Sequence, residues 1–455
     1  MNEARQDGDG SRRLEQDRSD CEGLVIPPTT HVELRRLSKG KGIGRTQKAW
    51  NDCHLSGIVA QNESADMSFH RQRLLVQGWR GIAHSYALVN QFQLVEFSRI
   101  PGLELFHQDA AFFGKHWSVI PDLFPAETED MIRSVPAPPV DLLPDAVLRI
   151  AYPYDFTPLP QGRLVVFGTA ECSICPKDSV VGAGNGKIGE ALEDSNATLL
   201  TPSEWSRRGF IRSGANPERV KVVPHGVDGV IFRPALSPEE KAKCRGKLGL
   251  KLEDFIFLNI GSLTFNKGIL ILIKAFVAIA ATNPNARLVL KYNESLYSAK
   301  AFINSLPGSF SEAERALLSP RIQLIGGVHA MTDLASLYQA ADAYVTPYHA
   351  EAFNLPALEA CACGLPVIAT AGGPTDEFLP EGVLLPIASH PLNIVRDGME
   401  MIVLQADSDS LARQMNAVMS DPGLVQRALK VGPRHAVGKL SWKNICARIV
   451  QVALE

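Results

Sequence analysis

Two glutamates, Glu351 and Glu359, lie eight positions apart in the segment EAFNLPALE. An ionised carboxylate carries only hydrogen-bond acceptors, so it can bind two vicinal hydroxyls at once. Asn354 and Pro356 favour the start of a helix between the two acids, and Gly364 suits its end. We therefore expect both carboxylates to face one cleft, beside a helix N-terminus that attracts anions.

The same turn offers unpaired backbone N–H groups from Phe353, Asn354 and Leu355. Such a turn could hold an anion and, beside it, a polyhydroxyl group such as a ribose diol or a sugar ring. The spacing alone leaves a second interpretation open, in which Glu359 only stabilises the helix dipole and Glu351 is a solvated loop residue.

A cation stands at the start of another expected helix, in the segment IGSLTFNKG that follows a buried strand. Gly261 lets the backbone turn closely, and Lys267 comes just before the helix. A lysine at this place opposes the helix dipole, so an anionic ligand such as a diphosphate accounts for it. A solvated lysine is the alternative.

A third candidate lies near the beginning of the patterned sequence. Residues 74–77 read as a strand, residues 78–84 as a glycine-containing loop, and a helix is expected from Ser85, with Ser85 as its N-cap. This arrangement also directs backbone N–H groups into a loop and favours an anion.

The elements that must position these residues are buried strands that alternate with helices. Apolar runs such as DFIFLNI, ARLVLKY and PVIAT recur through residues 223–438, and a similar block covers residues 69–222. This alternation predicts an α/β protein with two Rossmann-like, doubly wound parallel domains facing a central cleft. Residues 121–160 are proline-rich and are expected to be irregular, and residues 439–455 form a terminal helix. Ligands of such sheets bind at the carboxyl ends of the strands.

Composition narrows the class of protein. The chain has 455 residues and a net charge of −3, which disfavours a nucleic-acid partner. Its eight dispersed cysteines suit a reducing cytoplasm. Neither a signal peptide nor an apolar run of about 18 residues is apparent. Residues 1–68 are polar and patternless, so we expect a disordered extension, whose basic segment ELRRLSKGKGIGR offers peripheral contact with the inner face of a membrane.

Two short motifs suggest metal or redox chemistry. Asp407 and Asp409 follow an apolar strand as divalent-metal ligands can, but a helix follows directly, so an N-cap is the preferred interpretation. Cys172 and Cys175 have the spacing of half a zinc site or of a redox pair, but no second pair accompanies them, and we interpret them as structural. We therefore expect no metal site and no cofactor.

Four ordered motifs resemble those of retaining GT-B glycosyltransferases of the group 1, family 4-like type. EAFNLPALEACACGLPVIAT resembles the E-x7-E signature, and GSLTFNKG resembles the G-R-L-x-x-x-K-G loop. PSEWSRRGF followed by KVVPHGVDGVIFRP resembles the inter-domain entry, and SWKNICARIV resembles the terminal helix that crosses back onto the N-terminal domain.

The resemblance implies that the second domain binds a nucleotide-diphospho-sugar. Glu359 would bind the ribose diol of this donor. Glu351 and the backbone of Phe353, Asn354 and Leu355 would hold its sugar and phosphate.

The resemblance also implies a diphosphate subsite built from both domains. Lys267 would neutralise the leaving diphosphate in a loop that contains Gly261 and Ser262. The loop from Gly81 to His84 would face the same group from the acceptor side, with His84 positioning donor or acceptor. A packed loop histidine is the alternative for His84.

Two departures from the family pattern bear on this subsite. Ser262 stands where the family has a phosphate-binding arginine, which leaves Lys267 as the cation of that loop. Arg80 is a candidate to supply the missing charge. Asn354 stands where glycine is common, which narrows the expected sugar pocket.

The function implied by the resemblance is transfer of a hexosyl group from the donor to a hydroxyl of a carbohydrate, lipid-linked or other acceptor, with retention of anomeric configuration. Two alternatives stay open: a nucleotide-sugar epimerase on the same fold, and a non-catalytic nucleotide-sugar-binding protein.

Overall fold

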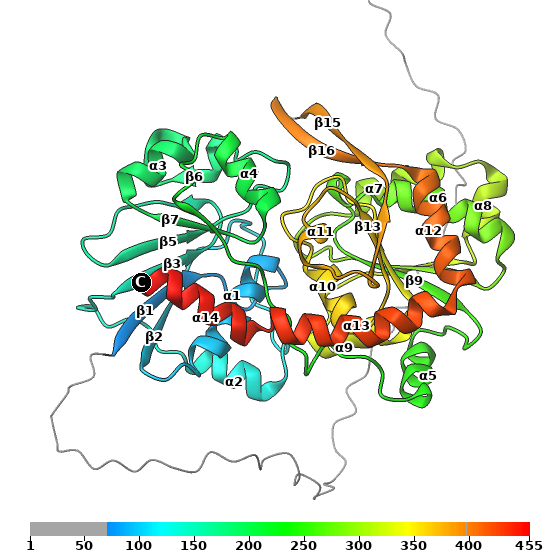
Figure 1. Ribbon diagram of the computed structural model, residues 1–455, viewed down its shortest axis with the longest axis horizontal. Helices are drawn as coiled ribbons and strands as arrows, with labels where there is room; N and C mark the ends of the chain where they lie inside the picture. Colours follow the sequence, from blue (N-terminus) through cyan, green and yellow to red (C-terminus); the bar gives the residue numbers. More distant parts are fainter. Residues whose placement is uncertain (1–70, 397) are drawn as a thin grey trace, which may run out of the picture.

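The computed structural model describes residues 71–396 and 398–455 of the chain. The expectations for residues 1–68 lie outside the described residues. Two six-stranded, wholly parallel sheets stand side by side, each flanked by helices (Figure 1). The predicted α/β class with two doubly wound units is therefore confirmed.

The first sheet has the strand order β2-β1-β3-β5-β7-β8. Its strands are β1 (Gln72–Gly78), β2 (Leu103–Asp109), β3 (Ala146–Ile150), β5 (Arg163–Phe167), β7 (Thr198–Thr201) and β8 (Val220–Val222). Its helices are α1 (Ser85–Phe97), α2 (Ala126–Ser134), α3 (Ile188–Ser195) and α4 (Glu204–Arg212). A small parallel pair, β4 (Tyr154–Asp155) and β6 (Val180–Val181), lies beside it, as do the 3-10 turns η1 (Lys177–Ser179) and η2 (Gly184–Gly186).

The second sheet has the order β11-β10-β9-β12-β13-β14. Its strands are β9 (Phe255–Ile260), β10 (Ala286–Lys291), β11 (Ile322–Ile325), β12 (Ala343–Thr346), β13 (Val367–Thr370) and β14 (Leu384–Ile387). Its helices are α5 (Pro238–Lys247), α6 (Ile269–Thr282), α7 (Lys300–Ser305), α8 (Glu312–Leu318), α9 (Met331–Ala340), α10 (Leu355–Ala362), α11 (Thr375–Phe378) and α12 (Ser408–Ser420). The 3-10 turns η3 (Phe265–Lys267) and η4 (Pro307–Ser309) precede α6 and α8.

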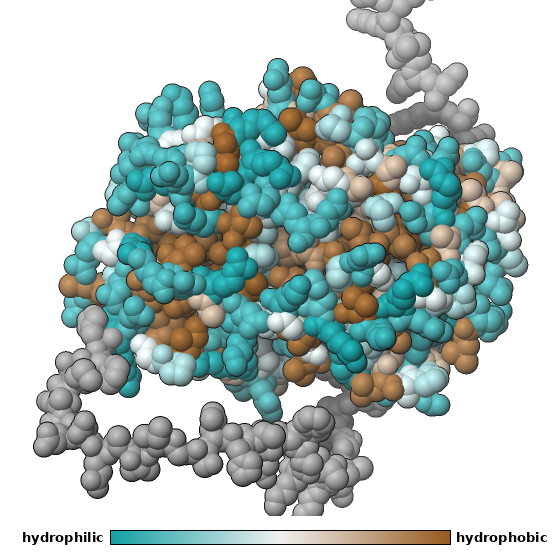
Figure 2. Space-filling model, viewed as in Figure 1, coloured by the Kyte–Doolittle hydropathy of each residue, from teal (hydrophilic) through white to brown (hydrophobic). Residues whose placement is uncertain are grey.

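The C-terminal helices join the two halves. Helix α13 (Pro422–Leu440) packs on α10, and α14 (Trp442–Leu454) packs on α1, β3 and β5 of the first sheet (Figure 1). Trp442 stacks on Phe92 of α1 with ring centroids 5.4 Å apart. Figure 2 shows apolar residues gathered over the first sheet on the face along which α14 runs. Burial of apolar surface is what keeps this helix on the first domain.

Two regions differ from the sequence prediction. The stretch 121–160, expected to be irregular, contains α2 and β3, and β3 is a central strand of the first sheet. The prolines lie outside β3, where they break no ladder hydrogen bond. The hairpin of β15 (Ser389–Arg396) and β16 (Met399–Ala406) was not predicted as a pair.

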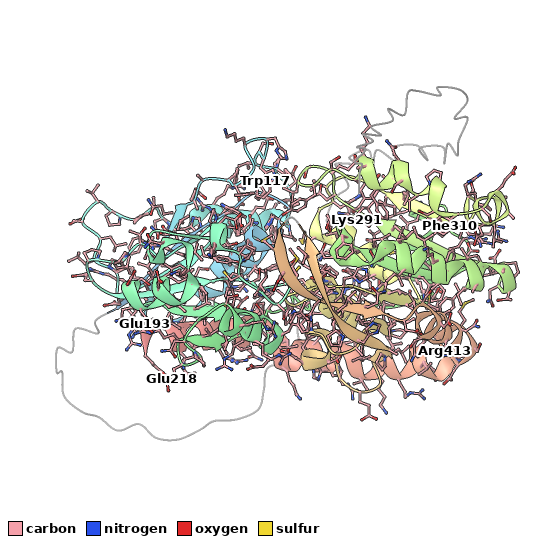
Figure 3. All side chains as sticks on the ribbon, turned by 90° about the horizontal axis from the view of Figure 1, so that it is seen from above. Trp117, Glu193, Glu218, Lys291, Phe310 and Arg413 are labelled. Atoms are coloured by element: carbon pink, nitrogen blue, oxygen red, sulfur yellow. The ribbon has the colours of Figure 1, made fainter. Side chains whose placement is uncertain are left out.

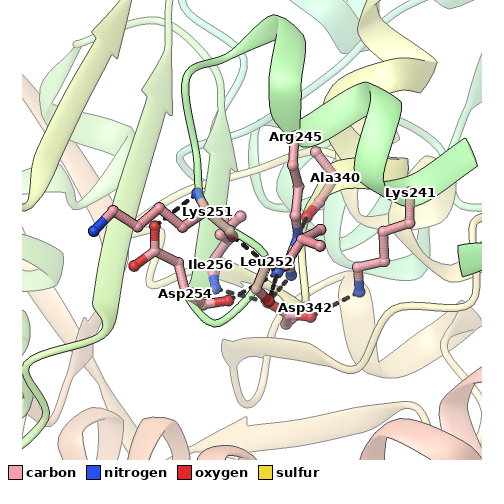
Figure 4. Close-up of polar contacts among 8 residues, drawn as sticks. All are labelled: Lys241, Arg245, Lys251, Leu252, Asp254, Ile256, Ala340 and Asp342. Atoms are coloured by element: carbon pink, nitrogen blue, oxygen red, sulfur yellow. Dashed lines mark hydrogen bonds and ion pairs between the residues drawn. The ribbon is translucent and has the colours of Figure 1, made fainter. Parts of the chain in front are cut away.

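The amino-terminal edge of the second sheet is fixed by a buried ion-pair network (Figure 4). Arg245 of α5 donates to an Asp342 carboxylate oxygen at 2.6 Å and to the carbonyl oxygens of Leu252 at 2.6 Å and Ala340 at 3.0 Å. Asp342 also accepts from Lys241 at 2.7 Å. Because every charge here has a partner, the network fastens α5 and α9 to the base of the sheet.

Candidate functional site

The carboxyl ends of β9, β10 and β12 form one edge of the second sheet. Lys291 ends β10, and its carbonyl oxygen accepts from the N–H of Gly261 at 3.0 Å, which ties the loop after β9 to β10. In Figure 3, Lys291 and Trp117 of the first domain both lie near the junction of the two domains. This is the edge at which open parallel sheets bind ligands.

Lys267 and Glu351 meet at this edge, as the sequence predicted for residues of one site. The Lys267 ammonium donates to a Glu351 carboxylate oxygen at 2.5 Å, and the two side chains are 22% and 8% exposed. Burial acts to lower the pKa of Lys267, but the Glu351 and Glu171 carboxylates outweigh it and raise the pKa. The lysine is therefore a cation throughout the neutral range.

Gly268 sets the direction of Lys267. This glycine ends η3 and begins α6 with a φ of 65°, and a Cβ at this position would collide with the carbonyl oxygen of Pro347. Only glycine combines this left-handed backbone with so close an approach. The turn brings Lys267 against the loop after β12, where Glu351 lies.

Glu171, in the first domain, is a member of this cluster that sequence reasoning missed. One of its carboxylate oxygens accepts from the Asn266 amide at 3.3 Å, across the two domains. Its backbone carbonyl accepts from the Trp205 indole at 2.8 Å. Its position in RLVVFGTAE, directly after the buried strand β5, was the available signal, because strand ends are where ligand-binding residues gather.

His84 is the N-cap of α1, so the prediction of Ser85 as N-cap was wrong. The Nδ1 atom of His84 accepts a hydrogen bond from the N–H of Tyr86 at 3.1 Å. Its Nε2 atom pairs with the hydroxyl of Tyr297, from the second domain, at 3.2 Å. Burial lowers the pKa of His84 to about 4, so the ring is neutral near pH 7.

An aromatic cluster surrounds this histidine. The ring centroid of His84 lies 5.2 Å from those of Trp79 and Trp117 and 6.3 Å from that of Tyr297. Tyr297 in turn lies close enough to Lys267 for the ammonium to act on the pKa of its hydroxyl. The structure thus brings His84 near the Lys267 cluster, with Tyr297 between them.

Gly81 lies in the loop before α1 with a φ of 73°, beside Val119. Its N–H donates to the Gln91 side chain at 3.0 Å. The sequence predicts that this loop presents N–H groups to a diphosphate. The N–H of Gly81 itself is already used within the first domain.

Asn354 is the N-cap of α10, as predicted. Its φ of 77° lies in the left-handed region, which asparagine tolerates better than most residues. Its side chain accepts from the N–H of Ala357 at 3.2 Å and donates to Thr346 at 2.9 Å. Asparagine can therefore replace a glycine here because it adopts the same backbone and fills its polar bonds internally.

The backbone at the start of α10 is left open. The Phe353 ring stacks on Phe378 with centroids 4.3 Å apart, so its side chain belongs to the core. Within the described part of the chain, the N–H groups of Phe353 and Asn354 have no hydrogen-bond partner. Leu355 and Glu359 line a small pocket one turn further on. This geometry leaves the two N–H groups available to an anion.

Glu359 does not contact Lys267. It accepts from the Tyr338 hydroxyl at 2.6 Å and lines the small pocket together with Asp228 and Trp442. Lys267 is not among the lining residues of that pocket. Burial raises the pKa of Glu359 to about 7. The two glutamates are connected through Tyr344, whose pKa is raised by burial and then by Glu351 and Glu359.

The candidate for an extra cation, Arg80, is occupied elsewhere. Its guanidinium makes two hydrogen bonds to the Asp109 carboxylate, at 2.8 and 2.7 Å, and a third to the Ile132 carbonyl. The suggestion that Arg80 replaces the missing arginine stays a prediction. Ser262 pairs with the hydroxyl of Thr264 at 2.8 Å.

The alternative metal motif is accounted for by helix capping. The Asp407 carboxylate accepts from the N–H of Ser410 at 2.6 Å and caps α12. Across residues 71–396 and 398–455, no group of three potential ligands is arranged to hold a metal ion. Within the same residues no helix is long and apolar enough to cross a bilayer.

Comparison with known proteins agrees with this geometry. Residues 240–434 match the family described as Glycosyl transferases group 1. A D-inositol 3-phosphate glycosyltransferase of Acidothermus cellulolyticus is 29% identical over 280 residues, which cover 59% of this chain and 56% of the relative. An uncharacterized glycosyltransferase of Methanocaldococcus jannaschii is 29% identical over 52% of this chain and 54% of its own length. The chain thus spans about half the length of the curated relatives it matches.

Solved structures show the same fold at low sequence identity. Anabaena HepE in complex with UDP-glucose has a TM-score of 0.59 at 17% identity, covering 84% of this chain and 98% of that chain. A sucrose-phosphate synthase from Thermosynechococcus elongatus has a TM-score of 0.60 at 18% identity, with the same coverage.

Proposed function

We propose that the chain, whose residues 240–434 match the glycosyl transferases group 1 family, transfers a hexosyl group from a nucleotide-diphospho-sugar to an acceptor hydroxyl with retention of configuration. The observation that carries the proposal is the cluster of Lys267, Glu351 and Glu171 at the carboxyl edge of the second sheet. A family match alone covers only residues 240–434. The cluster adds a partly buried cation that faces the first domain.

The proposed donor subsite extends from α6 to α10. Lys267 stabilises the diphosphate that leaves, the open N–H groups of Phe353 and Asn354 bind its oxygens, and Glu351 binds the sugar hydroxyls. Glu359, in its own small pocket, binds the ribose diol. UDP-glucose occupies the related HepE structure, which supports a donor of this class.

The proposed chemistry needs positioning more than a nucleophile. The bond between the sugar C1 atom and the diphosphate oxygen breaks, the electron pair stays on the diphosphate, and Lys267 neutralises the new charge. The acceptor oxygen then bonds to C1 on the same face, and its proton passes to the departing diphosphate.

The acceptor is proposed to enter from the first domain, beside His84 and its aromatic neighbours. His84 is neutral near pH 7, so it can accept or donate a hydrogen bond without a charge. The relatives named for D-inositol 3-phosphate support a polyhydroxyl acceptor. A cytoplasmic location stays part of the proposal because of the dispersed cysteines, and peripheral membrane contact stays part of it because of the basic segment ELRRLSKGKGIGR.

The test is a transfer assay with the glucose and galactose derivatives of five nucleoside diphosphates (UDP, GDP, ADP, CDP and dTDP) as donors. Polyols and glycans serve as acceptors, and NMR then identifies the anomer of the product. A retained anomer formed only with acceptor supports the proposal. Sugar conversion without acceptor would make the protein an epimerase, and donor binding without turnover would make it a binding protein. A Lys267→Met variant should lose turnover, and because it also leaves the Glu351 carboxylate without its ion-pair partner, circular dichroism checks that the variant is folded.

A further inference from the structure

Lys291 is a buried cation without a partner. The residue is 8% exposed, and within residues 71–396 and 398–455 its ammonium makes neither a hydrogen bond nor an ion pair. A buried ammonium without a partner carries a desolvation cost, so natural folds retain one rarely and mostly for a function. The Glu359 carboxylate is the charged group that favours the ionised form of Lys291.

The position of Lys291 in the fold is next to the proposed donor subsite. Lys291 is the last residue of β10, pairs in register with Ile260, and accepts from the N–H of Gly261 at 3.0 Å. It therefore stands beside the loop that carries Lys267, at the same carboxyl edge. The two lysines have different neighbours: Lys267 pairs with Glu351, and Lys291 lies within the influence of Glu359.

We propose that the Lys291 ammonium binds the donor diphosphate on its ribose side, while Lys267 binds it on its sugar side. This inference rests on the proposed function. Glu359 is the proposed ribose residue and Glu351 the proposed sugar residue, so a diphosphate that joins ribose to sugar spans the interval between the two lysines. A partner of two negative charges also accounts for a second cation that the protein itself leaves unpaired.

The test measures binding of nucleoside diphosphates without sugar. Thermal shift with UDP, GDP, ADP, CDP and dTDP first identifies the one that wild-type protein binds. Calorimetry then compares that diphosphate with its parent nucleoside, on wild-type protein and on Lys291→Met. Lys247→Met, at an exposed position near the end of α5 and at the opposite edge of the sheet, is the matched control.

We expect Lys291→Met to bind the diphosphate about 10- to 100-fold more weakly and the nucleoside within about two-fold of wild type. Lys247→Met should match wild type for both. Equal diphosphate binding by Lys291→Met and wild type would overturn the inference and leave the proposed function intact. An equal loss for nucleoside and diphosphate would also overturn it. If wild type binds none of the five, the proposed function fails and the inference fails with it.

Should Lys291→Met not fold, the pH dependence of the wild-type protein decides. Burial lowers the pKa of Lys291 to about 8, so diphosphate affinity should fall as pH rises above 8, by up to about tenfold per unit. The charged groups that face it are Glu359, whose pKa is about 7, and His329, whose pKa is lowered by burial. Neither loses a positive charge in this window. Constant affinity between pH 7.5 and 9.5 would overturn the inference.

Discussion

Two buried cations stand at opposite edges of the second sheet, and they differ in their hydrogen-bond partners. Arg245, at the amino edge, is 4% exposed and donates to one carboxylate and to several carbonyl oxygens. Lys291, at the carboxyl edge, is 8% exposed and donates to no described residue. The first cation is used in folding. The second has no such partner, and the difference separates the edge that stabilises the sheet from the edge that we propose binds the donor.

The largest effect is expected from the substitution of Arg245, which tests whether the amino edge stabilises the sheet. Arg245→Met leaves the partly buried Asp342 carboxylate with Lys241 as its one cation and with the N–H of Ile256, and it opens the anchor of α5, so the free energy of unfolding should fall by about 3 kcal/mol. Urea unfolding followed by circular dichroism measures it. A loss below about 1 kcal/mol would mean that the network does not stabilise the domain, and the exposed Lys247→Met serves as the unaffected control.

Asn354 lies at the carboxyl edge, and substitutions there test whether a residue of this edge also stabilises the fold. Asn354→Ala loses the cap of α10 and places alanine at a φ of 77°, so it should cost about 2–3 kcal/mol of unfolding free energy. Asn354→Gly keeps the backbone and should cost only about 1 kcal/mol. Equal losses in the two variants would show that backbone conformation is not what selects asparagine here.

Glu359 should show the reverse pattern, with a large effect on binding and a small one on folding. Glu359→Ala should weaken donor binding by about 1.5–3 kcal/mol, the scale of hydrogen bonds to a charged group. Calorimetry with the nucleoside diphosphate and with its nucleoside measures it. Unchanged affinity for both would make Glu359 a structural residue held by Tyr338.

The smallest expected effect is the pH dependence of stability. Burial raises the pKa of Glu359 to about 7, so the folded protein binds more protons than the unfolded chain between about pH 4.5 and 7. The contribution of Glu359 to stability is therefore full below pH 4.5 and is lost as pH rises through 7. Glu359→Gln should flatten this decline, by an amount on the order of 1–2 kcal/mol, in melting curves recorded from pH 4.5 to 8. A parallel decline in both proteins would contradict the assignment.

The sequence predicted the strands of the second sheet and helix α10 well because their signals are local. The apolar strands are continuous, and Asn354, Pro356 and Gly364 mark both ends of α10. The strand β3 was missed because the prolines around it dominate its neighbourhood, whereas its strand character comes from pairing with β1 and β5 on both sides.

Hydrogen bonds and ion pairs between side chains that are far apart in the sequence could not be predicted in the same way. Lys267 and Glu351 were expected in one site, and they form an ion pair. Whether Lys291, at the end of ARLVLK, is paired or left open depends on which side chains the fold brings to it. The pairing of Arg80 with Asp109 depends likewise on a contact between two strand ends that no local pattern encodes.

The place where the chain passes between its halves has a mechanical consequence. The N–H of Val227, on the outward passage, donates to the carbonyl oxygen of Leu440, on the return, at 2.8 Å. Both passages therefore run together along one line. His84 and Tyr297 meet across the two halves at another place, so a rotation of one half about this crossing would separate them. Under the proposed function, the same rotation would admit the substrates, release the nucleoside diphosphate and, on reversal, restore the alignment of the site.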